Sequence, residues 1–107
     1  MVIAMAFISP AYELTALGQR PPDSLVQTHV RVRIPKARHA DPVLSNLVNR
    51  YRLRVTILGA LLSANGQEDG WFELELSGTA DRLHQALLDL VELDADLWFE
   101  PEAADGL

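Results

Sequence analysis

The chain has 107 residues, the size of one ordinary domain with a single hydrophobic core. Apolar residues make up 49% of the sequence and the formal net charge is −6, a balance that is typical of an acidic globular protein and argues against nucleic-acid binding. The absence of cysteine excludes disulfides, thiolate metal sites, iron–sulfur clusters and thiol nucleophiles.

The two ends of the chain lack the regular patterns of its centre. Residues 1–8 are apolar, but no basic residue precedes them and Ser9-Pro10 follows, so the segment is too short to span a bilayer and is unlike a signal peptide. We therefore expect a cytoplasmic protein without membrane insertion. Residues 1–27 are expected to form an arm or linker, either a loose leader or an arm that docks on an apolar surface. Residues 101–107 are expected to form an acidic tail.

The first strand and helix are predicted from apolar spacing. Residues 28–34 alternate polar and apolar side chains, which predicts a strand that ends at Pro35. Asp41 then offers an N-cap, and Pro42 suits the first turn of a helix. The apolar stripe of this helix is expected to be Val43, Leu44, Leu47, Val48 and Tyr51.

The second half of the chain predicts two strands, a helix and a last strand. Residues 53–62 are predicted to form a strand that is apolar on both faces. The inward face is expected to carry Leu53, Val55, Ile57 and Leu61, and the outer face Leu58, Ala60 and Leu62. A loop with Asn65-Gly66 and Asp69-Gly70 leads to a strand whose Phe72, Leu74 and Leu76 point inward. Thr79 caps a second helix, and residues 96–99 form the last strand.

This order of elements predicts an α+β protein with the ferredoxin-like βαββαβ fold. Its four-stranded antiparallel sheet is expected to have the spatial order 4-1-3-2, with two helices on one face. The central core residues should be Leu47, Val55, Leu74 and Leu87. The two central strands then set Arg31 and Arg33 opposite Glu73 and Glu75. RNA-binding proteins of this fold expose aromatic residues at these positions, so we expect no nucleic-acid partner.

Three segments carry a resemblance to a known family: DPVLS at residues 41–45, VTIL at 55–58 and GWFELELSG at 70–78. They resemble the NIL domain, an ACT-like regulatory domain known from the C-terminus of the ATPase subunit of bacterial methionine importers. The similarity runs from about Val30 to Phe99, and the NIL-like domain is expected to span residues 28–100. The chain looks most like the short stand-alone NIL proteins of oxygenic photosynthetic bacteria. The resemblance implies a homodimer that binds methionine or a similar amino acid near its interface. Thr56 stands where the family tripeptide has Asn, which shortens the polar contact to such a ligand.

Few residues suggest chemistry of their own. Lys36 and Arg38 precede a predicted helix N-terminus, where they could bind a carboxylate or phosphate, or form a solvated loop neutralised by Asp94 and Asp96. The histidines lack the spacing of a metal site and the serines lack a partner motif, so we expect no metal, cofactor or catalysis. Trp71 and Trp98 are either half-buried at sheet edges or anchors of an interface.

Two hypotheses for the function follow. The first is a regulatory module that binds an amino acid as a homodimer, with ligand contacts from Lys36, Arg38, Thr56, Ile57 and Leu58. Its interface would contain Leu58, Ala60, Leu62, Trp71 and Trp98. The second is an adaptor or assembly subunit of a larger complex, with an unknown protein partner and no small-molecule ligand.

Overall fold

The computed structural model describes residues 10–38, 42–62 and 68–99. In these ranges the elements follow in this order: α1 (Pro10–Gly18), β1 (Leu25–Ile34), the short 3-10 helix η1 (Lys36–Arg38), α2 (Val43–Asn49), β2 (Arg54–Leu61), β3 (Gly70–Thr79), α3 (Ala80–Glu92) and β4 (Asp96–Phe99). The predicted N-cap at Asp41, the Asn65-Gly66 turn, and residues 1–8 and 101–107 lie outside the described residues.

The strands of the described ranges form one antiparallel sheet in the order β2-β3-β1-β4, so the predicted ferredoxin-like topology is confirmed. The central pair is β1 and β3, whose register runs from Leu25 opposite Thr79 to Ile34 opposite Gly70. Because β3 continues to Thr79, it offers pairing partners for three residues before the predicted start of β1 at residue 28.

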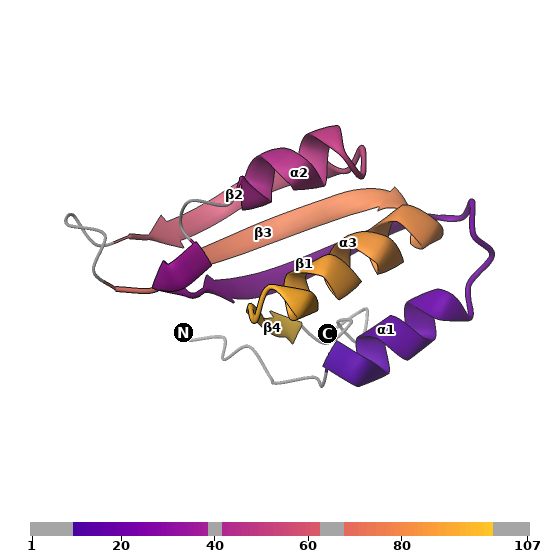
Figure 1. Ribbon diagram of the computed structural model, residues 1–107. Coiled ribbons are helices and arrows are strands. Elements are labelled where there is room, and N and C mark those ends of the chain that lie inside the picture. The colour runs from indigo at the N-terminus through magenta and orange to yellow at the C-terminus, as the bar shows by residue number, and fades with distance from the viewer. Residues whose placement is uncertain (1–9, 39–41, 63–67, 100–107) are drawn as a thin grey trace, which may run out of the picture.

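The helices cover one face of this sheet, with α2 against β2 and α3 against β3 and β1 (Figure 1). The core lies between the two layers. Leu47, Leu74 and Leu87 are buried there as predicted, whereas Val55 is only partly buried because β2 is an edge strand. The predicted cap of α3 is also confirmed, since the hydroxyl oxygen of Thr79 accepts a hydrogen bond from the backbone N–H of Arg82 at 3.3 Å.

Helix α1 occupies a region in which we expected an arm or extended linker. It packs against α3 and β4 (Figure 1). Leu17 is buried in the main core, with only 6% of its surface exposed. Leu14 packs against the same core. Leu14 and Leu17 are three residues apart, which places them on one face of a helix, but nine residues are too few for a clear period in the sequence. Residues 10–18 are therefore a segment that docks on the rest of the domain and not a loose leader.

A β-bulge in β2 corrects the predicted faces of this strand. Ile57 pairs with Leu74 and Gly59 with Glu73, so Leu58 is an extra residue that has no partner on β3. Beyond the bulge, Ala60 pairs with the inward Phe72 and Leu61 with the outward Trp71. The prediction that Ala60 faces outward and Leu61 inward is therefore wrong, because one extra residue inverts the alternation of side chains.

Candidate functional site

The edge strand β2 exposes large apolar side chains. The exposed fraction is 54% for Ile57, 49% for Leu58, 70% for Leu61 and 59% for Leu62. Natural edge strands usually carry charges or proline, which prevent them from pairing with another chain. In β2 the charged residue is Arg54 at its first position. Residues 57–62, which we call the β2 edge, therefore have the properties of a surface that a partner covers.

A hollow of about 320 Å³ lies beside the β2 edge. Its lining consists of Arg31, Gly59, Ala60, Leu61, Trp71, Phe72 and Glu73. A Cβ atom placed on Gly59 would meet no other atom within 4 Å, so the hollow is open at this residue. Its volume is near the lower end of ligand pockets, which span roughly 300–1,000 Å³. The same edge thus offers both protruding leucines and a space that can receive an apolar group.

Opposite charges meet at the wall of this hollow. Arg31 donates a hydrogen bond from Nη2 to Glu73 Oε1 at 3.3 Å, as the predicted pairing requires, and His29 Nε2 lies 3.0 Å from Glu73 Oε2. Burial by itself would raise the pKa of Glu73, but hydrogen bonds from Arg31 and His29 outweigh burial and hold this pKa below its ordinary value. The hollow therefore contains both a guanidinium and a carboxylate that stays ionised at neutral pH.

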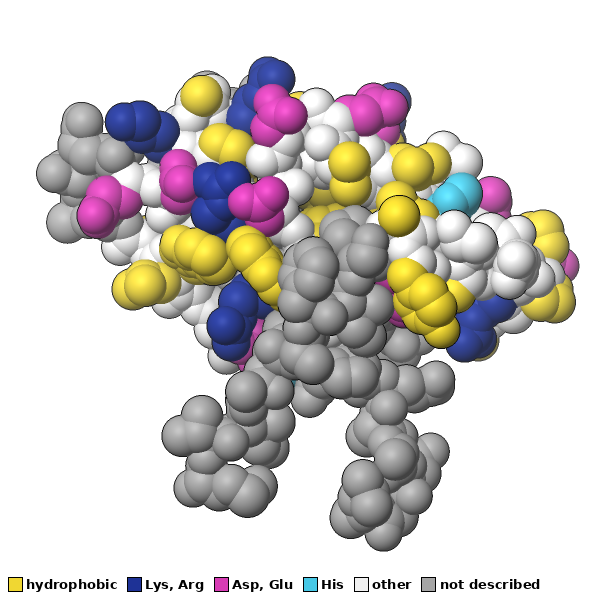
Figure 2. Space-filling model, turned by 90° about the horizontal axis from the view of Figure 1, so that it is seen from below, with side chains coloured by type: hydrophobic (Ala, Val, Ile, Leu, Met, Phe, Trp, Pro, Cys, Tyr) yellow, Lys and Arg dark blue, Asp and Glu magenta, His cyan; other side chains and the backbone are white. Residues whose placement is uncertain are grey.

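Arg33 departs from the predicted pairing with Glu75. The register sets it between Trp71 on β3 and Asp96 on β4. Its guanidinium donates to Asp96 Oδ2 at 2.7 Å and also pairs with Asp69, which accepts a hydrogen bond from the backbone N–H of Lys36 at 2.9 Å. Acidic and basic side chains are likewise interspersed on the side of the molecule shown in Figure 2.

The two tryptophans stack on each other on the outer face of the sheet. The ring centroids of Trp71 and Trp98 are 5.3 Å apart with an interplanar angle of 26°, and both residues are half-buried. This contact supports the interpretation of local packing for Trp98. Trp71 additionally lines the hollow at the β2 edge, where one part of its surface stays accessible.

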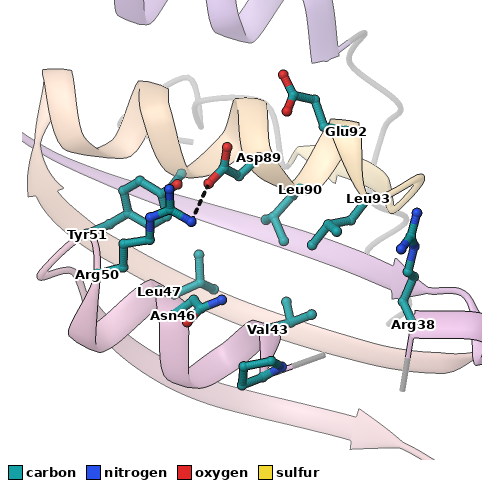
Figure 3. Close-up of a pocket in the computed structure, with 12 residues that line it drawn as sticks. Arg38, Val43, Asn46, Leu47, Arg50, Tyr51, Asp89, Leu90, Glu92 and Leu93 are labelled. Atoms are coloured by element: carbon teal, nitrogen blue, oxygen red, sulfur yellow. Dashed lines mark ion pairs between the residues drawn. The ribbon is translucent and has the colours of Figure 1, made fainter. Parts of the chain in front are cut away.

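A second and larger cavity, of about 570 Å³, is a groove between α2 and α3 (Figure 3). Val43 and Leu47 point into it from α2, and Leu90 and Leu93 point into it from α3 and the turn after α3. Arg50 spans the groove at one end, where its Nη1 lies 3.8 Å from Asp89 Oδ2. Arg38 stands at the other end (Figure 3).

The predicted ligand residues do not meet within one chain. Arg38 lines the groove on the helix side of the sheet, whereas Thr56 pairs with Glu75 and so lies on the outer face. Lys36 and Arg38 follow the end of β1 at Ile34, which is opposite Gly70; Ile57 is opposite Leu74, four residues or about 13 Å further along β3. Thr56, Ile57 and Leu58 remain together on β2, next to the hollow.

The predicted interface residues do not share one face, because Ala60 faces inward whereas Trp71 and Trp98 lie on the outer face of the sheet. Leu58 and Leu62 are exposed on the β2 edge, Ala60 and Trp71 line the hollow, and Trp98 stacks on Trp71 from β4. Sequence reasoning missed Leu61, Arg31 and Glu73 as site residues. Gly59 was the available signal, because a glycine inside a strand often marks a bulge or an open space.

The described ranges contain no cluster of three or more potential metal ligands, and no helix in them is long and apolar enough to cross a membrane.

Comparison with known proteins identifies relatives of this chain. A family model of the NIL domain matches residues 28–98. An uncharacterised protein of Synechococcus elongatus is 34% identical over 73 residues, which cover 68% of this chain and 90% of that protein. An uncharacterised protein of Synechocystis is 38% identical over 73 residues, covering 68% of this chain and 73% of that protein.

A solved structure has a similar fold. The crystal structure of the C-terminal domain of an ABC transporter ATP-binding protein from Enterococcus faecalis superposes with a TM-score of 0.61 at 20% identity. The superposition covers 82% of this chain and 94% of that one.

Proposed function

Because the chain belongs to the NIL domain family, we propose that it is a non-catalytic regulatory module that binds methionine or a similar amino acid at the interface of a homodimer. The observation that carries this proposal is the exposed apolar β2 edge with the hollow beside it. A monomer rarely keeps such an edge accessible to solvent.

The proposed dimer joins two β2 strands in an antiparallel pair. A two-fold interface must be self-complementary, so each chain has to supply both the protruding group and the space that receives it. The β2 edge supplies Leu58 and Leu61 as protruding groups, and the hollow at Gly59 as the space. Strand pairing would also satisfy the outward backbone groups of β2, which a side-chain contact alone would leave to water.

The proposed ligand lies in the hollow where the two chains meet. An amino acid carries a carboxylate, an ammonium group and a side chain, and the hollow offers a partner for each. Arg31 would bind the carboxylate, Glu73 would bind the ammonium group, and Trp71 with Leu61 would contact an apolar side chain. A methionine sulfur gains additional stabilisation beside an aromatic ring. Thr56 and Leu58 would close the site from the adjoining part of β2.

Calorimetric titration with methionine tests the ligand, and light scattering tests the dimer. We expect Arg31→Gln to weaken methionine binding about tenfold or more, since a hydrogen bond to a charged group contributes about 1.5–3 kcal/mol. Arg54→Gln is the matched control, because Arg54 lies on β2 but does not line the hollow. Leu58→Arg should convert the dimer to a monomer. Equal binding by both arginine variants would contradict the proposed ligand site.

One observation, the exposed β2 edge, also supports the adaptor hypothesis. The β2 edge can pair with a strand of another protein as readily as with a second copy. A wild-type protein that is monomeric at about 10–100 μM and binds no amino acid would favour the adaptor over the regulatory dimer.

A further inference from the structure

Gly59 lies inside β2, although the chain itself needs no glycine at this position. Its φ is outside the left-handed region that favours glycine, and a Cβ atom placed on it would meet no other atom within 4 Å. Glycine also weakens a strand, because it loses more conformational freedom on folding than other residues do and has no side chain to pack. A glycine in a strand can instead mark a place where a ligand or another backbone approaches closely. The open space above Gly59 is therefore available to a group from outside the chain.

The register of the strands shows which side chains surround this space. On the outer face of the sheet, Arg31, Glu73 and Gly59 form one row across β1, β3 and β2. Trp71 and Leu61 form the next row on β3 and β2, and the residues of both rows line the hollow. Neighbouring strands are about 4.8 Å apart, so the missing side chain of Gly59 leaves a space directly beside Glu73.

The carboxylate of Glu73 is open toward this space. Its Oε1 accepts a hydrogen bond from Arg31 Nη2 at 3.3 Å, and its Oε2 lies 3.0 Å from His29 Nε2. Both of these partners come from β1, whereas the neighbour on β2 is Gly59, which has no side chain. An ionised carboxylate has about four acceptor sites, so about two remain for a donor that enters from the β2 edge. The side chain of Glu73 is 34% exposed, which leaves it within reach of a ligand.

We propose that Gly59 determines the specificity of the hollow for free amino acids, because the ammonium group of the ligand reaches Glu73 through the space above Gly59. This inference rests on the proposed function and deepens it, since it assigns the part of the hollow that the amino group occupies. A primary ammonium group is compact, charged and rich in N–H donors. An acylated amino group carries no charge, keeps one N–H donor and brings the bulk of the acyl group. The hollow should therefore reject N-acylated amino acids and residues within a peptide.

Calorimetric titration of the full chain tests this specificity with methionine, N-acetylmethionine and 4-(methylthio)butanoate, which is methionine without its amino group. We expect the wild type to bind methionine at least about tenfold more tightly than either of the others, because only methionine makes a charge-assisted hydrogen bond to Glu73. Gly59→Val should abolish this preference by weakening methionine alone, since its side chain fills the space in front of the carboxylate. A role of Gly59 in the fold or the dimer would instead weaken all of these ligands equally.

Gly59→Ala adds one methyl group and should reduce the preference to a smaller extent. It replaces Gly59→Val if light scattering shows that valine disturbs the dimer. Gly18→Val is the matched control, because it adds the same side chain on α1, outside the hollow, where a Cβ atom would stand at an ordinary contact distance of 3.8 Å from the ring of His84.

The possible outcomes separate this inference from the proposed function. Equal affinities of methionine and 4-(methylthio)butanoate in the wild type, or an unchanged preference in both Gly59 variants, would overturn the inference, while binding of methionine itself would still support the proposed function. A wild type that binds no amino acid would overturn the proposed function and this inference with it.

Discussion

Leu74→Ala tests how much the packing between the sheet and the helices contributes to the stability of the domain. Leu74 lies on the central strand β3, is 1% exposed, and stands between Val30 on β1 and Ile57 on β2. Neighbouring strands and α3 restrict how far the site can collapse around a cavity, so we expect a loss of about 3–5 kcal/mol in the free energy of unfolding. In a domain of this size that loss lowers the melting temperature by roughly 12–30 °C.

Ile57→Ala is the matched control, because Ile57 pairs directly with Leu74 but is 54% exposed. About half of its apolar surface remains in water, so its truncation should cost only about 1 kcal/mol. Thermal and urea unfolding followed by circular dichroism measure both variants at two protein concentrations. Equal losses that do not depend on concentration would refute the assignment of Leu74 to the core and Ile57 to the surface. If the loss of stability in Ile57→Ala is larger at the higher protein concentration, at which more of the wild type is dimeric, Ile57 is part of the interface.

Two further outcomes follow from single contacts. A Cβ on Gly78 would stand 2.7 Å from Cδ2 of the buried Leu53, so Gly78→Ala should lower the free energy of unfolding in urea by about 1–3 kcal/mol. A Cβ on Gly59 would meet no atom within 4 Å, so Gly59→Ala should change this free energy by less than about 1 kcal/mol. A larger loss for Gly59→Ala than for Gly78→Ala would contradict the packing. Because the pKa of Glu73 is lower in the folded protein, its contribution to stability is complete above the ordinary value of about 4.5 and is lost as the pH falls through the lowered pKa. Glu73→Gln should therefore flatten the acid limb of the stability profile, and an unchanged acid limb would show that Arg31 and His29 do not stabilise the carboxylate.

The elements and their order could be predicted from the sequence because they rest on local patterns. The alternation around Val30 and Val32 and the apolar stripe through Leu83 and Leu87 record which side of each element is buried. Right-handed crossovers then allow few arrangements of these strands and helices. The family could also be recognised, since the segments at residues 41–45, 55–58 and 70–78 lie within the matched region.

The candidate site depended on contacts that no local pattern records. One extra residue at Leu58 moves Leu61 to the outer face. Gly59 is compatible with a bulge in the sequence, but only the pairing of β2 with β3 shows which residue is the extra one. Arg33 pairs with Asp96 and not with Glu75, because the register of the strands, and not the alternation of side chains along one strand, decides which residues lie opposite each other.

By itself, the sequence determined the fold and the family, because the burial of each strand and helix is repeated at a fixed period along the chain. Only the tertiary structure decided that α1 joins the core, that Arg38 and Thr56 lie on opposite sides of the sheet, and that a groove separates α2 from α3. These features depend on how far apart elements are held by their neighbours. That distance is set by packing across the whole domain, which no segment of the sequence specifies alone.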